Sequence, residues 1–324
     1  MNLGLDLGYS AVKAVAGPQR MVTFPSVVGT PDRARFSING TGGDIILDTL
    51  GNGTFLVGEG AIMQSRFVDR REDRAWIESD AYRCLMLAAF TEMTTATSCD
   101  LMIVTGLPVA FYSDQGLLRD RFLGEHRVAR EGRRAQLFRV TDARVIPQPF
   151  GALLAEALND RGKVVDQDMA AGAVAIIDVG GKTTNLLSVN RMTEIGRETA
   201  SVAVGAWDVA RAVREYLTEH CPDLELRDHQ VIDAIVNRRA RYYGELVDLG
   251  AIVEATLEPM ADQVVAQATQ LWNSGAALDA ILVAGGGALL LGPFLKRHFK
   301  HLRIVDNPVF ANALGYWRFA QCLG

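Results

Sequence analysis

The sequence has few of the cysteines and histidines that build disulfide frameworks and metal clusters, and it lacks the long apolar run of a membrane span. Its 324 residues include only four cysteines and five histidines, with no CxxC pair and no recognisable signal peptide. We therefore expect reduced thiols and a cytoplasmic location. No apolar run approaches the roughly 18 residues that a membrane-spanning helix needs, so we expect no membrane span.

An excess of positive charge is also missing. The 33 Lys and Arg residues are outnumbered by 38 Asp and Glu, for a net charge of −5, so no general basic field exists to hold nucleic acid by its phosphates. Residues 126–144 are the local exception, with six arginines around Gly132. Their alternation favours a hairpin with a solvated arginine face. Because Phe138 is the only Phe, Tyr or Trp in this stretch, aromatics for base stacking are nearly absent, and we expect no direct contact with nucleic acid.

One strand–turn–strand pattern occurs twice, about 170 residues apart. "LGLDLGYSAVKAVAG" at residues 3–17 and "AVAIIDVGGKTTNLLSV" from residue 173 each contain an apolar strand, an aspartate and a glycine turn. The length is that of two domains at the usual ~150 residues each, and the repeat indicates an internal duplication. We predict domains at residues 1–150 and 151–324.

The segments that follow the two repeats differ in composition. Residues from about 20 to 75 are rich in β-forming residues with glycine and asparagine turns, which predicts a small inserted sheet. Residues from about 207 to 275 have helical spacing, with helices expected at 206–220, 227–244 and 246–275. The continuous apolar run at 100–112 is typical of a parallel strand covered on both faces.

Asp6 and Asp178 raise the central question, because a carboxylate in a buried strand is costly unless it is paired or holds a metal. Glycines after each aspartate let the backbone approach a ligand and turn its amides toward an anion. Two such loops could bind a polyphosphate, with Mg²⁺ held by the aspartates through its waters. The residues that we assign to phosphate binding are Gly8, Tyr9, Ser10 and Lys13 in the first loop and Gly180, Gly181, Lys182 and Thr183 in the second. Lys182 either contacts phosphate or faces solvent.

A third glycine element, Gly285, Gly286 and Gly287, stands between an apolar strand and a helix. Its backbone offers a flat surface for a nucleoside, and the N-terminus of the following helix favours phosphate. Each element alone is common in ordinary strand-to-helix packing. The three together, in this order and spacing, are much more specific for a nucleotide site.

These three motifs, "LGLDLGYSAVKA", "AIIDVGGKTTNLLSV" and "ILVAGGGALLL", resemble the two phosphate motifs and the adenosine motif of the actin, sugar-kinase and DnaK-type ATPase superfamily. "FPSVVG", "TFLVGEGA", "TGLPVAFY" and "DNPVFANALGYWRFA" are similar to plasmid-segregation actin-like proteins of the ParM/StbA type and their archaeal relatives. The resemblance covers essentially the whole chain. It implies an α/β, actin-like fold: two duplicated domains, each a mixed sheet with flanking helices, around a nucleotide cleft.

The resemblance also implies an activity. Such a protein binds Mg-ATP, hydrolyses it and polymerises into filaments that segregate plasmid DNA or position cargo, through a DNA-binding adaptor protein. Asp6 and Asp178 match the aspartates that hold Mg²⁺ through water, and Lys13 matches a lysine that contacts phosphates. Gln148 falls where the family positions the attacking water, although a polar turn residue is an alternative interpretation. The sequence does not distinguish ATP from GTP.

Two other functions use the same core. A small-molecule kinase of the sugar-kinase type needs a general base, often an aspartate, and no further candidate stands beside Asp6 and Asp178. A PilM-like, membrane-associated assembly ATPase is the other alternative. Purine contacts could come from Asn237 or Arg241, although an amphipathic surface helix explains both residues equally well. The candidate aromatic groups for subunit contacts are Phe36, Phe55, Trp76, Tyr242 and Tyr243, each of which ordinary packing would also explain.

Overall fold

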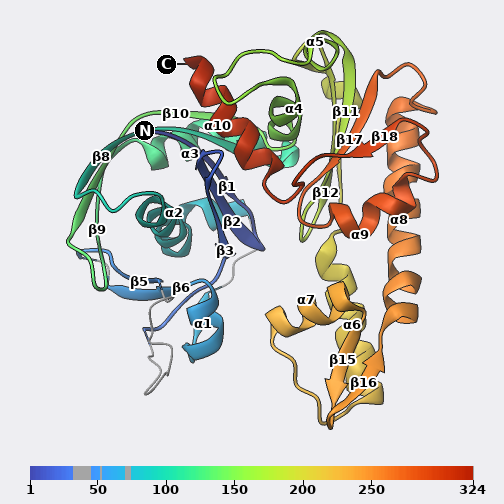
Figure 1. The fold of residues 1–324 in the computed structure, drawn as a ribbon, viewed down its shortest axis with the longest axis horizontal. Helices are drawn as coiled ribbons and strands as arrows, with labels where there is room; N and C mark the ends of the chain where they lie inside the picture. Colours follow the sequence, from blue (N-terminus) through green and yellow to red (C-terminus); the bar gives the residue numbers. More distant parts are fainter. Residues whose placement is uncertain (32–44, 52, 70–73, 324) are drawn as a thin grey trace. The chain divides into compact units, whose positions relative to one another are not determined.

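The computed structural model describes residues 1–31, 45–51, 53–69 and 74–323. The chain divides into two compact units (Figure 1). Unit 1 comprises Met1–Ala170 and Phe310–Gly324, and unit 2 comprises Ala171–Val309. No helix in the described ranges combines the length and apolar character that crossing a membrane requires.

Unit 1 is built on a mixed sheet in which β1 is an interior strand. β1 (Asn2–Leu7) pairs antiparallel with β2 (Ala11–Gly17) and parallel with β8 (Ser98–Leu107). β10 (Gln136–Pro147) runs parallel to β8, and β9 (Gly124–Arg130) pairs antiparallel with β10. The predicted parallel strand and arginine hairpin are therefore both confirmed.

The β-rich segment continues this sheet instead of forming a separate small one. Within the described residues the strand order is β3-β2-β1-β8-β10-β9-β5-β6-β4-β7, because β5 pairs with β9. The elements are β3 (Arg20–Pro25), β4 (Val28–Gly29), β5 (Ile45–Asp48), β6 (Thr54–Val57), α1 (Glu59–Gln64), β7 (Val68–Asp69) and the 3-10 helix η1 (Arg74–Glu78). Phe36, a candidate contact residue, lies outside the described residues.

The helices of unit 1 pack against this sheet. In α2 (Asp80–Met93), Ser79 caps the first turn by accepting from the amide of Tyr82, and the helix is almost entirely buried. The remaining elements are η2 (Val109–Asp114), α3 (Gln115–Phe122), α4 (Phe150–Ala157), α5 (Gln167–Ala171) and α10 (Ala311–Leu323). 

The C-terminal helix α10 returns to unit 1, so the compact units differ from the predicted division at residue 150. α10 packs against β1, β8 and α4, and it comes so close to β1 that a Cβ on Gly4 would lie 2.1 Å from the carbonyl oxygen of Ala313. Trp317 and Ala313 also form a small apolar cluster with Val15. Local sequence patterns do not predict this packing of α10 against segments that are distant in the sequence.

Unit 2 repeats the central arrangement of unit 1. β11 (Ala173–Val179) pairs antiparallel with β12 (Thr184–Asn190) and parallel with β17 (Ala280–Ala284), as β1 does with β2 and β8. The other elements of this unit are β13 (Thr193–Glu194), η3 (Gly196–Glu198), β14 (Ala200–Val202), α6 (Ala206–His220), α7 (Asp228–Asn237), β15 (Arg239–Tyr242), β16 (Glu245–Asp248), α8 (Gly250–Trp272), α9 (Ala288–Leu295) and β18 (Leu302–Ile304).

Two of the predicted helices are shorter than expected. The helix predicted over 227–244 ends at Asn237, because Arg238 adopts the left-handed conformation with φ 53°. The chain then forms the β15–β16 hairpin, whose turn contains Tyr243 and Gly244, both at positive φ. The prediction was therefore wrong at 238–244 and at 246–248, and Arg241 lies on a strand.

Candidate functional site

The first loop is organised around Asp6, at the end of β1. The Asp6 residue is only 3% exposed. Lys13 is its partner across the β1–β2 ladder, and Nζ lies 3.3 Å from Oδ2. The side-chain amide Nε2 of Gln148 donates to Oδ1 at 3.0 Å. Both carboxylate oxygens of this buried charge are thus compensated within unit 1, before any metal is considered.

Gln148 is fixed by its backbone directly after β10. Its amide donates to the carbonyl oxygen of Leu107 at 2.7 Å, and its carbonyl accepts from the Tyr316 hydroxyl at 2.8 Å. Gly106 is required here, since a Cβ would lie 2.0 Å from the Tyr316 oxygen and 2.8 Å from Gln148 Cα. The predicted catalytic residue is therefore brought to Asp6 by a well-supported turn.

Ser26 supports the first loop, although the sequence analysis did not identify it as a site residue. Its hydroxyl donates to the Gly8 carbonyl at 2.6 Å, and its amide donates to the Ser10 carbonyl at 3.0 Å. The amide of Gly8 closes the loop on the Ala11 carbonyl at 3.2 Å. In the sequence, the only indication of this role is that a serine directly follows a β-forming stretch. These bonds hold the loop backbone in one conformation.

Aromatic packing supports the loop from its other side. The ring of Tyr9 lies 4.9 Å from that of Trp76, which in turn packs edge-on against Tyr82 at 4.9 Å. Trp76 is 6% exposed, so this candidate contact residue belongs to the loop's support. Burial, and secondarily the charge of Asp6, raises the pKa of Tyr82. The hydroxyl of Tyr82 therefore stays protonated.

The second loop repeats the geometry in unit 2. Asp178 is 2% exposed at the end of β11, and the Gly180 amide closes the turn on the Thr183 carbonyl at 2.9 Å. The carbonyls of Gly180 and Gly181 accept from the first two amides of α6 at 3.0 and 2.8 Å. The start of α6 thereby fixes the loop. Lys182 is exposed at its tip.

Asn185 was missed by the sequence analysis. It lies opposite Asp178 in the β11–β12 register and is 3% exposed. Its side-chain oxygen Oδ1 has no hydrogen-bond partner among the described residues. A buried acceptor without a donor is costly in a native fold. This oxygen beside Asp178 is therefore suited to accept from a ligand or a water of the site.

The triple-glycine element lies directly against the second loop. Gly285 has φ 91°, and a Cβ there would lie 2.4 Å from the Val179 carbonyl oxygen and 2.5 Å from Oδ1 of Asp178. The amide of Gly287 donates to the same Val179 carbonyl at 2.9 Å. Gly286 is exposed, with open space around it. Only glycine allows this approach, which leaves one open backbone face before α9.

The predicted purine contacts lie elsewhere in unit 2. Asn237 and Arg241 both line a groove between α7 and the β15–β16 hairpin. The Asn237 amide donates to the Asp233 carbonyl, and Arg241 donates to the Gly244 carbonyl. These bonds account for both side chains without a purine.

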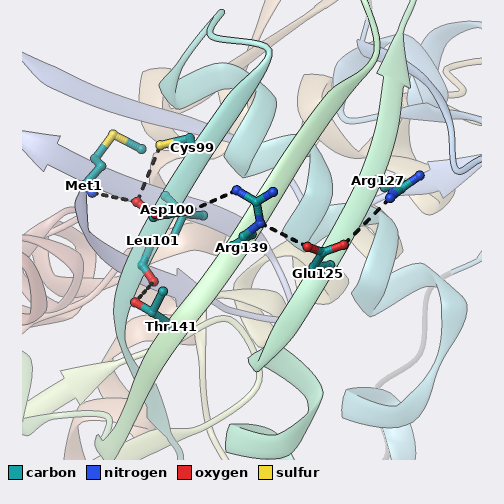
Figure 2. A network of polar contacts seen from close by, with 8 residues as sticks. All are labelled: Met1, Cys99, Asp100, Leu101, Glu125, Arg127, Arg139 and Thr141. Carbon is teal, nitrogen blue, oxygen red and sulfur yellow. Dashed lines mark hydrogen bonds and ion pairs between the residues drawn. The ribbon is translucent and has the colours of Figure 1, made fainter.

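Acidic side chains pair with the arginines of the β9–β10 hairpin (Figure 2). Arg139 donates to Glu125 at 3.0 Å and lies 3.7 Å from Asp100, and Arg127 lies 3.8 Å from Glu125. Arg130 is buried against Glu92, and burial lowers its pKa to about 10. Arg127 and Arg139 therefore fit the predicted solvated arginine face, whereas Arg130 is buried.

The sequence matches two known families of protein domains. Residues 4–151 match the family of actin-like protein N-terminal domains. Residues 176–297 match the C-terminal domain of the MreB-like archaeal actin homologues. The two matches cover both loops, the Gln148 turn and the triple glycine.

Whole-chain relatives agree with the domain matches. Archaeal actin homologues of Thermoplasma acidophilum and Thermoplasma volcanium are each 25% identical over 97% of both chains. A solved archaeal actin homologue has a TM-score of 0.82 at 21% identity, covering 100% of this chain and 99% of its own. A 15-stranded ParM filament from Clostridium botulinum has a TM-score of 0.81 at 23% identity over 99% of both chains.

The chain therefore contains two actin-like family domains, at residues 4–151 and 176–297, and has the actin-like fold. The resemblance identified from the three glycine motifs is confirmed. One of the solved archaeal homologues is a complex with ADP, with a TM-score of 0.80 at 20% identity over 99% of both chains.

Proposed function

We propose that this protein is an ATPase that binds Mg-ATP through the loops after β1 and β11 and polymerises into filaments. The observation that carries the proposal is the duplicated strand–loop–strand, in which each loop follows a buried aspartate, Asp6 or Asp178. The ADP-bound archaeal homologue supports the nucleotide, and the ParM filament supports the assembly.

The residues present fit a hydrated magnesium ion. Mg²⁺ keeps several waters and is usually bound through one or two carboxylates and the substrate phosphates. Asp6, Asp178 and the unpartnered oxygen of Asn185 are acceptors of the kind that metal-bound water requires. When bound, Mg²⁺ would supply positive charge to the β- and γ-phosphates. Lys13 can contribute a further positive charge.

Gln148 is suited to orient the attacking water. Because its Nε2 donates to Asp6, the amide is held in one orientation, and the oxygen Oε1 is left as an acceptor for a water proton. Glutamine is a poor base, so hydrolysis would depend on positioning and charge stabilisation. Asp6 is then a positioning residue for Gln148 in addition to its role toward the metal.

For the biological role, we propose filaments that segregate plasmid DNA or position a cargo in the cell. The paired arginines and the net charge of −5 give no basis for direct DNA binding, so a DNA-binding adaptor protein would link filament and cargo.

The test compares the wild type with Gln148→Ala and Asp178→Ala. With Mg-ATP the wild type should release phosphate and form pelletable filaments visible by negative-stain microscopy. Gln148→Ala should bind ATP within a few-fold of wild type but hydrolyse it about 10²-fold more slowly. Asp178→Ala should lose Mg-dependent binding and filaments. Unchanged turnover in Gln148→Ala would remove its catalytic role, and phosphate transfer to a sugar without filaments would favour a kinase.

A further inference from the structure

Unit 2 carries a groove that the two loops do not use. It has a volume of about 510 Å³ and lies between α7, the β15–β16 hairpin and the loop at 224–226. Figure 1 shows the hairpin beside α6 and α7 at one end of this unit. Its apolar lining includes Leu224, Leu226 and Leu246, of which Leu246 is 57% exposed. The groove is thus accessible and partly apolar.

The charged side chains of this groove form no ion pairs with one another or with other described residues. Arg239 and Arg241 alternate on β15 and share one face of the hairpin. Arg241 donates to the Gly244 carbonyl, and the side chain of Arg239 has no hydrogen-bond or ion-pair partner among the described residues. Glu225 and Asp233, from the loop and from α7, likewise form no ion pair in the described part of the chain. A ligand for this groove should carry both signs of charge beside an apolar group.

Unit 1 presents a segment with that chemistry. Residues 163–168 span the end of the α4–α5 connection and the first two residues of α5, and they read Lys-Val-Val-Asp-Gln-Asp. Val164 is 42% and Val165 60% exposed. Lys163 and Asp168 are exposed, and neither forms an ion pair with a described residue. The segment therefore has a cation at one end, an anion at the other, and two valines between them.

The backbone of this segment is held in place. Val164 forms a β-bridge with Leu158, and the Val165 amide donates to the Ala157 carbonyl at 2.9 Å. Asp166 caps α5 by accepting from the Met169 amide at 3.0 Å. The two exposed valines are consequently presented by a fixed chain, and little conformational entropy would be lost on docking.

We propose that residues 163–168 of one copy dock into the groove of a second copy. Lys163 would meet Glu225 and Asp233, and Asp168 would meet Arg239 and Arg241. The valines would cover the groove leucines. Because the two surfaces differ, the contact is head-to-tail and can propagate into a filament. The inference rests on the proposed assembly and names one of its contacts.

The first experiment disables each surface separately. The groove variant is Arg239→Glu/Arg241→Glu, and the segment variant is Val165→Asp/Asp168→Arg. Each should raise the critical concentration for pelleting with Mg-ATP at least about tenfold, because like charges and a buried carboxylate oppose docking. The control is Arg134→Glu/Lys300→Glu, which makes the same change of charge as the groove variant at two exposed residues and should pellet as wild type. ATP binding and unfolding midpoints verify that all variants fold.

The second experiment mixes the two disabled variants. The groove variant keeps an intact segment, and the segment variant keeps an intact groove. A 1:1 mixture should therefore form heterodimers in sedimentation velocity but no filaments, whereas each variant alone stays monomeric. Variants that pellet like wild type, or a mixture that stays monomeric, would overturn the proposed docking. The same results are expected if the groove binds a different protein instead of a second copy. A wild type that never pellets would count against the proposed function, while the mixture still decides the docking.

Discussion

The side-chain amide of Gln148 donates to the carboxylate of Asp6 across 142 positions of sequence, at 3.0 Å. Lys13 lies 3.3 Å from the other oxygen of the same carboxylate. Asp6 is therefore the common partner of Lys13, which we assign to phosphate binding, and of Gln148, which we assign to positioning the attacking water. This shared partner links the loop after β1 to the turn after β10.

Removing the Lys13 side chain should show how much its ion pair with Asp6 contributes to the stability of the fold. Lys13→Met leaves a buried carboxylate with Gln148 as its remaining side-chain partner among the described residues, and we expect the free energy of unfolding to fall by about 2–3 kcal/mol. Urea denaturation measures this change. The double variant Asp6→Asn/Lys13→Met removes both charges and should regain part of the loss. Equal stability of Lys13→Met and wild type would show that the pair contributes nothing.

The triple glycine offers a matched pair of substitutions. Gly285→Ala places a Cβ 2.4 Å from the Val179 carbonyl oxygen at φ 91°, so we expect a loss of at least about 1 kcal/mol and weaker nucleotide binding. Gly286→Ala enters open space and should leave stability within about 0.5 kcal/mol of wild type. Thermal unfolding and titration with a fluorescent nucleotide measure both effects. A larger loss in Gly286→Ala than in Gly285→Ala would contradict the assigned packing.

The two glycine loops were predictable because their signals are local. A strand that ends in aspartate and glycine is written in consecutive residues, and its recurrence at Asp6 and Asp178 needs no knowledge of the fold. The family resemblance alone suggested a role for Gln148 in positioning water, and its hydrogen bond to Asp6 was not predicted. Nothing in residues 147–149 indicates a partner on β1, which is separated from β10 by β8 in the sheet.

The remaining features depend on tertiary packing or on single dihedral angles. Helical periodicity continues past Asn237, and only the positive φ of Arg238 ends the helix there. Asn185 was recognised as a site residue only from its register opposite Asp178. Ser26 was recognised only from its hydrogen bond to the Gly8 carbonyl. The return of α10 to unit 1 depends on contacts between residues some 300 positions apart, which no local pattern encodes.

The close packing of α10 against α4 should be sensitive to one methyl group. A Cβ on Gly315 would lie 1.8 Å from the Gly151 carbonyl oxygen, so Gly315→Ala must displace the helix, and we expect a loss of about 2–3 kcal/mol. Gly116→Ala in α3 is the control, because no atom lies near its Cβ. There the better helix propensity of alanine should be neutral or stabilising by up to about 1 kcal/mol. Calorimetric melting compares the two, and similar losses in both would disprove the tight contact.

His126 should make unit 1 sensitive to mild acid. Burial, together with the positive charges of Arg83 and Arg121, lowers the pKa of His126 below 6.5, although its ring bond to the Phe122 carbonyl, at 2.6 Å, opposes the shift. The unfolded chain therefore binds a proton more readily than the folded one. The corresponding stability is fully present above pH 6.5 and declines as the pH falls through that value toward the folded pKa. In denaturation series from pH 7.5 to 5, His126→Gln should show a shallower decline than wild type, and His220→Gln, at an exposed residue of α6, should keep the wild-type slope. Identical slopes in His126→Gln and wild type would mean that another group is responsible for the acid sensitivity.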